Sequence, residues 1–325
     1  MKAITFVSPG GPGVLRLTEV LDLQPRDEQL LVRVRATGVN RADVLQRKGG
    51  HAPPPGESEI LGLELAGEVE ALGSSVRGFR HGDRVFALAG GGGYAEKAVV
   101  DYRLAMGIPA GWSFAQAAAV PEVFFTAQET LFTLGELEAG ETVLVHAAGS
   151  GVGTAGIQMA RAAGARVLIT AGSAEKIRKT KELGAHEGCN YKEKDFAAWV
   201  KEVTKGKGTD LIQDFVGAPY WERNLDCLTV GGRLVLVGTL GGPKVDVNLR
   251  TIMVKRLKIL GSVLRARSLE EKIAITRRFK EKWLPQLAAG MMQPVIDKVF
   301  FLNDAAEAHR YMEANQNFGK IILEN

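Results

Sequence analysis

Apolar and polar residues follow different patterns in successive parts of the chain. Residues 2–100 contain short strand-like pieces such as LLVRVRATGV, LELAGEVEALG and DRVFALA, separated by glycine and proline, which predict an antiparallel, partly barrel-like β domain. Residues 114–134 are alanine-rich and predict a helix. From residue 141 to about 264, short apolar strands alternate with helical stretches, the pattern of a parallel sheet with right-handed crossovers. The tail, with VIDKVFF and GKIILEN, adds strands and a helix that we expect to fold back onto the first domain.

These patterns predict an α/β protein with two domains. We place a catalytic β domain at residues 1–120, completed by residues 265–325, and a doubly wound parallel sheet of the Rossmann type at residues 121–264. A chain of 325 residues exceeds one typical hydrophobic core, which supports the division. No apolar run approaches the roughly 18 residues of a membrane span, so no membrane partner is expected.

The segment from residue 142 to residue 172 predicts a dinucleotide-binding site. A buried strand, Thr142–Ala147, is followed by small residues, an expected helix, Thr154–Ala163, and a second strand, Arg166–Thr170. Small residues in the turn let a pyrophosphate approach the unpaired amides at the helix N-terminus, where the helix dipole favours negative charge. The expected cofactor contacts in this turn are Ser150, Gly151, Val152 and Gly153.

The turn departs from the strict G-x-G-x-x-G pattern. Ala148 and Ser150 occupy the first two glycine positions, so a tight packing turn in another doubly wound protein is the alternative interpretation. The strand before the turn and the helix and strand after it favour the dinucleotide site.

The residues after the second strand predict which dinucleotide binds. NAD-specific sites commonly place an acidic residue about 20 positions after the glycines, where it holds the ribose hydroxyls. This chain has Gly172 and Ser173 there, with Lys176 and Tyr191 further on, and these groups suit a charged 2′-phosphate. The sequence therefore predicts NADPH. The alternative is a solvated Lys176 on a helix over 174–183 and an ordinary half-buried Tyr191.

Charge and cysteine content narrow the class of protein. The 41 basic and 37 acidic residues give a net charge of +4, and the basic residues are scattered, so a nucleic-acid partner is not expected. Cys189 and Cys227 are expected to be reduced and buried. The first residues, MKAITFVSPGG, lack the apolar core of a signal peptide, so we expect a cytoplasmic protein.

The whole chain resembles the medium-chain dehydrogenases/reductases, and among them the zinc-free quinone oxidoreductases related to zeta-crystallin. The segments that carry the resemblance are GGPGVLRL, GVNRADVLQRKG, PPPGESEILGLELAGEV, GDRVFAL, AAAVPEVFFTAQ, HAAGSGVG, TAGSAEK and GKIIL. NRADVLQR and PPPG are most similar to the tumour-suppressor-induced branch of these enzymes. The resemblance implies a GroES-like β domain beside the Rossmann domain, NADPH as cofactor, a quinone as substrate, and a homodimer.

The resemblance also implies that zinc is absent. Zinc alcohol dehydrogenases of this fold carry cysteine and histidine where this chain has Asn40 and Leu63. Asn40, Leu63 and Glu64 do not supply the three ligands of a catalytic zinc, so we expect no metal. Without zinc to polarise an alcohol, the substrate is expected to be an electron-poor acceptor, either a quinone or an α,β-unsaturated carbonyl compound.

Four residues are candidates for catalysis. Asn40 is expected to donate a hydrogen bond to the oxyanion that develops on the acceptor, Asp43 to hold the loop, and Thr126 to touch the nicotinamide or its ribose. His51 stands where related enzymes usually have tyrosine, and it could donate a proton. The alternatives are a turn closed by Asn40, a segment capped by Asp43, a Thr126 bonded back into its helix, and an idle loop histidine.

Further contacts are expected where strands end. We assign additional cofactor contacts to Gly238, Thr239, Leu240, Leu264, Arg265 and Lys320. Arg265 could meet the cofactor phosphate or an anionic acceptor, or form only a surface salt bridge. The run Gly90–Gly93 predicts a mobile turn.

Two other functions stay open at this point: an NADPH-dependent enone or alkenal reductase, and an NADPH-binding structural or RNA-binding protein with little turnover.

Overall fold

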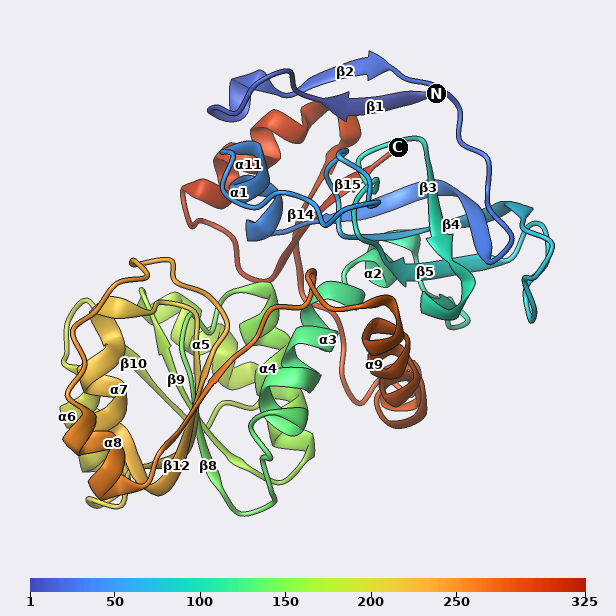
Figure 1. Cartoon of the computed structure of the whole chain (residues 1–325). Helices are drawn as coiled ribbons and strands as arrows, with labels where there is room; N and C mark the ends of the chain where they lie inside the picture. The colour runs from blue at the N-terminus through green and yellow to red at the C-terminus, as the bar shows by residue number, and fades with distance from the viewer. The chain divides into compact units, whose positions relative to one another are not determined.

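The computed structural model describes residues 1–325, and the chain forms two compact units (Figure 1). Unit 1 comprises Met1–Phe125 and Leu264–Asn325, and unit 2 comprises Thr126–Val263. The first boundary between the units, after Phe125, lies inside a helix and five residues after the position expected from the sequence. The second boundary, after Val263, lies one residue before its expected position.

Unit 1 is built on a seven-stranded sheet. Its order is β14-β15-β3-β4-β5-β7, and β6 pairs with β3 beside this path. All neighbours are antiparallel except β14 and β15, and β1 and β2 form a separate antiparallel pair. The strands are β1 (Lys2–Thr5), β2 (Arg16–Glu19), β3 (Gln29–Val39), β4 (Glu64–Leu72), β5 (Arg84–Leu88), β6 (Lys97–Asp101), β7 (Ala105–Gly107), β14 (Ile296–Phe301) and β15 (Lys320–Glu324).

The helices of unit 1 pack beside this sheet. They are α1 (Arg41–Arg47), α2 (Phe114–Ala118), α9 (Leu269–Lys282), α10 (Leu284–Ala288) and α11 (Ala305–Glu313), with short 3₁₀ turns at Pro12–Val14, Tyr102–Leu104 and Leu302–Asp304. Helices α1 and α11 contact each other (Figure 1). The tail completes the sheet as predicted, because β15 pairs with β3 and sets Ile321 opposite Val39. This pairing brings Lys320 to the residues that follow β3.

Unit 2 is a six-stranded parallel sheet with the order β10-β9-β8-β11-β12-β13. The strand order reverses between β8 and β11, which is the switch point where doubly wound sheets bind ligands. The strands are β8 (Thr142–Val145), β9 (Arg166–Ala171), β10 (Glu187–Asn190), β11 (Thr209–Asp214), β12 (Leu228–Leu236) and β13 (Lys258–Gly261). The helices are α4 (Gly151–Ala162), α5 (Ala174–Glu182), α6 (Phe196–Val203), α7 (Trp221–Cys227) and α8 (Leu249–Lys255), with a 3₁₀ turn at Ala218–Tyr220.

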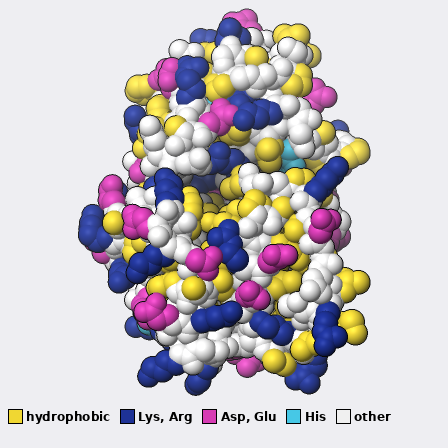
Figure 2. Space-filling view, turned by 90° about the vertical axis from the view of Figure 1, so that its left-hand side faces the viewer, with side chains coloured by type: hydrophobic (Ala, Val, Ile, Leu, Met, Phe, Trp, Pro, Cys, Tyr) yellow, Lys and Arg dark blue, Asp and Glu magenta, His cyan; other side chains and the backbone are white.

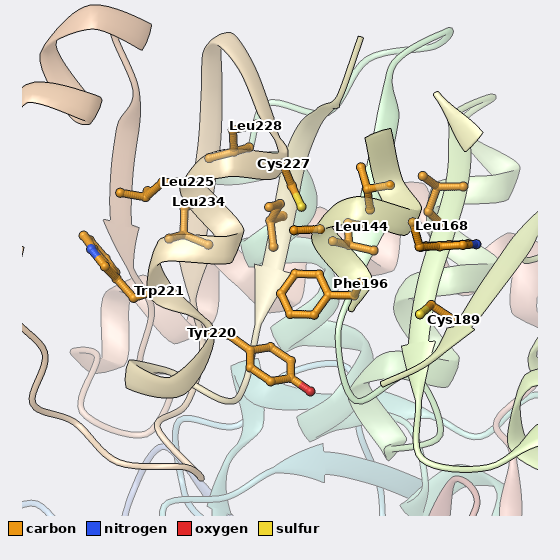
Figure 3. Packing of buried hydrophobic residues seen from close by; sticks show 14 of the residues in the cluster. Leu144, Leu168, Cys189, Phe196, Tyr220, Trp221, Leu225, Cys227, Leu228 and Leu234 are labelled. Carbon is orange, nitrogen blue, oxygen red and sulfur yellow. The ribbon is translucent and has the colours of Figure 1, made fainter. Parts of the chain in front are cut away.

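The core of unit 2 explains why these segments form a sheet covered by helices. Alternate residues of the strands, including Leu144 and Leu168, pack against Phe196 of α6 and Leu225 of α7 (Figure 3). In Figure 1, α6, α7 and α8 lie along one face of the sheet and α4 along the other. Cys189 and Cys227 are both free and buried, as predicted.

Two expectations about helices were wrong. The helix expected over residues 114–134 is divided into α2, α3 (Pro121–Gln128) and one π-helical turn at Glu129–Thr133. Pro121 starts a new helix because its ring prevents it from continuing the preceding one. Helix α4 begins at Gly151, three residues earlier than expected, since the Ser150 side chain caps it by accepting a hydrogen bond from the Gly153 amide at 3.0 Å.

The expectation of a mobile turn at Gly90–Gly93 was also wrong. The segment packs against the chain before β4: the Gly92 amide donates to the Ile60 carbonyl and the Gly93 amide to the Gly62 carbonyl. A Cβ atom on Gly91 would lie 2.4 Å from the Ser58 carbonyl oxygen, so the glycines allow close backbone packing.

Charged residues of both signs are interspersed over the face of the molecule that Figure 2 shows. None of the helices is long and apolar enough to cross a membrane.

Candidate functional site

The turn between β8 and α4 presents backbone amides to an anion. The first N–H groups of a helix have no acceptor within it, and here they belong to the partly exposed Gly151 and Val152. Gly153 is necessary for the packing, because a Cβ atom there would lie 2.7 Å from the Ala148 carbonyl oxygen. The helix dipole adds to the attraction for negative charge. This end of α4 therefore has the geometry that a pyrophosphate requires.

The same turn contains a strained residue. Ala147 has a φ of 47°, in the left-handed region that side chains disfavour. Strain of this kind concentrates at ligand-binding turns, where the surrounding structure holds it.

The residues expected to recognise the 2′-phosphate lie after β9 and, for Tyr191, after β10. Ser173 caps α5, and its hydroxyl accepts a hydrogen bond from the Lys176 amide at 3.2 Å. A Cβ atom on Gly172 would lie 2.8 Å from the Tyr191 hydroxyl and 3.3 Å from Cε of Lys192. The structure thus brings Gly172 and Tyr191 together and adds Lys192, a cation that sequence reasoning missed although it is adjacent to Tyr191.

Gly238, Thr239 and Leu240 form the loop after β12. Thr239 and Leu240 are exposed, and the Leu240 amide donates to the Phe215 carbonyl at 3.0 Å, which joins this loop to the one after β11. Because β8, β9, β11 and β12 are parallel, their carboxyl ends and the loops that follow lie at one edge of the sheet.

A buried network of polar side chains joins these strand ends. His146 is fully buried, with Nδ1 2.8 Å from the Thr170 hydroxyl and Nε2 2.8 Å from Oδ1 of Asn224. Since Oδ1 of Asn224 only accepts, Nε2 carries the proton and Nδ1 accepts from Thr170. Asn224 then donates to the Asp214 carboxylate at 3.1 Å. Burial lowers the pKa of His146 to about 4 and raises that of Asp214 to about 6.

Sequence reasoning missed this network. The only signal was a histidine near the end of a predicted buried strand, and the sequence alone is consistent with either a ligand contact or a place in the core. Its neutral, fully bonded imidazole positions the loops of the edge and does not face solvent.

In unit 1, Asn40 and Lys320 meet in a buried cluster with Glu64. The Lys320 ammonium donates to Oε1 of Glu64 at 2.5 Å, to Oδ1 of Asn40 at 2.7 Å and to the Val39 carbonyl at 3.2 Å. Nδ2 of Asn40 donates to the same Glu64 oxygen at 2.8 Å. The sequence analysis named Asn40 and Lys320 separately. It considered Glu64 only when asking whether the chain has the ligands of a catalytic zinc. The β15–β3 pairing is what joins them.

Asp43 is fully buried and holds the chain around this cluster. Its carboxylate accepts from the Asn40 amide at 2.7 Å and from the Gly62 amide at 3.0 Å. The Tyr94 hydroxyl, 3.4 Å from the carboxylate, links it to His309. Burial raises the pKa of Asp43 to about 6, against the lowering effect of the two amides. These contacts combine the two roles weighed for Asp43, since it caps α1 and also fixes the following loop.

Glu122 borders the same cluster from the first turn of α3. Its amide donates to Oε2 of Glu64 at 2.8 Å, while its half-buried carboxyl has no hydrogen-bond or ion-pair partner in the protein. Burial and repulsion by Glu64 raise the pKa of Glu122 to about 8, against the attraction of Lys320. Thr126 follows four residues later and is largely buried.

Arg265 is buried and does not form a surface salt bridge. Its guanidinium donates to the Gly90 carbonyl at 3.0 and 3.1 Å and to the His51 carbonyl at 3.1 Å. The pKa of His51 is lowered by burial and by repulsion from Arg265. The preceding residue, Leu264, is buried.

The cluster does not fit a zinc ion. Leu63 is apolar, both the amide oxygen and the amide nitrogen of Asn40 are hydrogen-bonded, and an ammonium already neutralises Glu64. A second cation beside Lys320 would be repelled.

Comparisons with known proteins agree with this architecture. The family described as "Alcohol dehydrogenase GroES-like domain" matches residues 26–125, and the one described as "Zinc-binding dehydrogenase" matches residues 151–278. The chain is 36% identical to the quinone oxidoreductase of Rattus norvegicus over 99% of its length and 97% of that protein, and 36% identical to that of Pseudomonas aeruginosa over 99% of each chain. A solved structure of Escherichia coli quinone oxidoreductase with NADPH has a TM-score of 0.89 at 31% identity, covering both chains completely.

Proposed function

Because this chain belongs to the quinone oxidoreductase family of the medium-chain dehydrogenases/reductases, we propose that it is an NADPH-dependent reductase that transfers a hydride to a quinone. The observation that carries the proposal is the edge of the unit 2 sheet. There, the partly exposed amides of α4 lie beyond β8, Ser173 and Lys176 lie beyond β9, and Tyr191 lies beyond β10, while Gly172 and Ser173 directly follow β9 in place of an acidic residue. Bound NADPH would supply the hydride.

The unit 2 residues have distinct expected roles toward NADPH. The amides of Gly151 and Val152 hold the pyrophosphate, with Ser150 and Gly153 setting the turn, and Lys176 gives the 2′-phosphate a charge-assisted hydrogen bond. Lys192 adds a second positive charge near Gly172. The loop Gly238–Leu240 lines the same edge of the sheet and is assigned to the nicotinamide half of the cofactor.

The unit 1 residues are assigned to the acceptor. One N–H of Asn40 makes only a long, 3.4 Å contact to the Gly38 carbonyl, so it can donate to an acceptor oxygen, while the other is held by Glu64. Thr126, the first residue of unit 2, is largely buried, and its hydroxyl has no hydrogen-bond partner in the protein; it is assigned to the nicotinamide ribose. His51, with Arg265 on its carbonyl, shapes the approach of the acceptor.

The test is oxidation of NADPH, followed by its absorbance, with a panel of quinones and a matched panel of enones. Turnover with quinones and not with enones supports the proposal, and the reverse result indicates an enone or alkenal reductase. If calorimetry finds NADPH bound and neither panel is reduced, the chain is a binding protein rather than a reductase.

We also propose a homodimer formed through the edge of the unit 2 sheet. β13 is an edge strand, and the segment around it exposes apolar side chains that water would not favour: Leu240, Val247, Leu249, Met253, Val254 and Val263. A second copy would continue the sheet and cover this segment. Sedimentation should give a dimer for the native chain and a monomer for Met253→Lys with Val263→Glu. If the double variant stays a dimer, the dimer interface does not lie at this edge of the sheet. The cytoplasmic location expected from the sequence stays a prediction.

A further inference from the structure

Glu122 combines features that the proposed function leaves unused. Its carboxyl belongs to the first turn of α3, is half-buried, and bonds to no other group of the protein. The Glu122 amide is fixed by Glu64 at 2.8 Å, so the backbone that carries this carboxyl is held against the buried cluster. An acidic group placed without a partner beside a buried carboxylate needs an explanation other than stability.

The Glu64 carboxylate relates Glu122 to Asn40, the residue assigned to the acceptor. Oε1 of Glu64 accepts a hydrogen bond from Nδ2 of Asn40 at 2.8 Å, and Oε2 accepts one from the Glu122 amide at 2.8 Å. Both residues are therefore fixed on the same buried carboxylate of unit 1. An acceptor oxygen bound by Asn40 would lie on the part of unit 1 that also carries the Glu122 carboxyl.

We propose that Glu122 is the general acid that protonates the reduced acceptor, an inference that rests on the proposed function. Bound NADPH would supply the hydride by loss of a C–H bond of its dihydronicotinamide; the quinone would gain two electrons and one proton as an O–H bond at one carbonyl oxygen, leaving a hydroquinone monoanion. The Glu122 O–H bond then breaks, its proton joins the anionic oxygen, and the carboxylate regains a proton from water. The sum is NADPH, a quinone and one proton converted to NADP⁺ and a hydroquinone.

Neighbouring ionisable groups are less suited to this role. Both carboxylate oxygens of Glu64 and Asp43 accept hydrogen bonds, and the Lys320 ammonium donates all three of its protons within the cluster. His51 has a lowered pKa, so its imidazole is mostly neutral at neutral pH. Arg265 donates to two carbonyls and does not release a proton.

The charges that face Glu122 keep its proton available. Glu64 on β4 and Asp43 on α1 oppose its ionisation, while Lys320 on β15 and Arg265 favour it. Burial outweighs the two cations and raises the pKa of Glu122 to about 8, so the carboxyl is mostly protonated at neutral pH. Activity that depends on this proton should therefore fall as the pH rises through about 8.

The experiment compares Glu122→Gln with Glu59→Gln, which removes a carboxylate from an exposed position of the same unit. At saturating NADPH and 1,4-benzoquinone, Glu122→Gln should lower kcat on the order of a hundredfold and abolish the decline at high pH. Glu122→Asp should restore part of kcat and the decline. Glu59→Gln should change neither, and calorimetry should give equal NADPH affinity for all four proteins.

A second readout does not depend on turnover. Infrared difference spectra of the native protein without cofactor should show the carbonyl band of a protonated carboxyl that titrates near pH 8, and Glu122→Gln should lack that band. A variant that keeps native kcat and the native pH profile would overturn the assignment, and so would a Glu122 band that is already lost at neutral pH. If the native protein reduces no quinone, the proposed function itself fails. That result is distinct from failure of the Glu122 assignment, in which the native protein is active and Glu122→Gln is equally active.

Discussion

The buried ion pair between Lys320 and Glu64 offers the sharpest test of how unit 1 is stabilised. Their side chains are 2% and 0% exposed, and Nζ lies 2.5 Å from Oε1. Lys320→Met keeps most of the apolar stem and removes the ammonium, which leaves the Glu64 charge with only the Asn40 and Glu122 N–H groups as donors. Removing one partner of a buried pair costs about 3–5 kcal/mol, so we expect a loss of that size in the free energy of unfolding.

Urea unfolding of Lys320→Met, Glu64→Gln and the double variant measures the coupling between the two charges. The double variant removes both charges and leaves neutral groups. Its loss in free energy of unfolding should therefore be about 2–3 kcal/mol smaller than the sum of the losses of the two single variants. Hydrogen exchange at the β3 and β15 amides assigns the loss to unit 1. As a control, Lys258→Met breaks an exposed pair with Glu136 and should cost less than about 1 kcal/mol. Additive single losses would refute the reasoning.

Three further predictions concern single side chains. Lys176→Ala should weaken NADPH binding by about 1.5–3 kcal/mol and leave NADH binding unchanged, and equal calorimetric losses for both cofactors would contradict a 2′-phosphate contact. His51→Phe should change the apparent KM for the quinone and leave the pH profile near neutrality intact, because the pKa of His51 is already lowered. If the pH–rate profile of His51→Phe instead lacks an inflection that the native protein shows, His51 acts as a proton donor. His146→Phe should destabilise the protein by about 2–4 kcal/mol at neutral pH, since Thr170 and Asn224 lose their partners. Because the native pKa of His146 is about 4 and the unfolded one about 6.5, the stability due to the neutral imidazole is lost as pH falls through this window, and urea unfolding should show the difference between the two proteins shrinking there.

The dinucleotide unit was predictable because its signals are local. A strand, a turn of small residues and a helix follow one another within about 30 residues, and each depends on neighbours in the sequence. The start of α4 was predicted three residues too late because Gly151 and Gly153 disfavour a helix. The hydrogen bond from the Gly153 amide to the Ser150 side chain stabilises the first turn, and only the structure shows it. The Gly90–Gly93 run was misread for the same reason: glycine permits either mobility or close packing, and the contacting backbone lies at residues 58–62.

The site in unit 1 was only partly predictable. Asn40 was identified through resemblance and Lys320 among the contacts expected at strand ends, yet their hydrogen bond joins residues 280 positions apart. Glu122 carried no signal in the sequence, since an acidic residue in the first turn of a helix is ordinary. Its unpartnered carboxyl acquires meaning only from Glu64, which holds its backbone.

The sequence by itself determined the fold class, the order of the strands along the chain and the class of cofactor, because periodicity and turn residues act over short distances along the backbone. Only the tertiary structure decided which buried polar groups face one another, because the pairing of β15 with β3 joins segments from opposite ends of the chain. That pairing puts an ammonium against Glu64, and the environment it creates sets the protonation of Glu122.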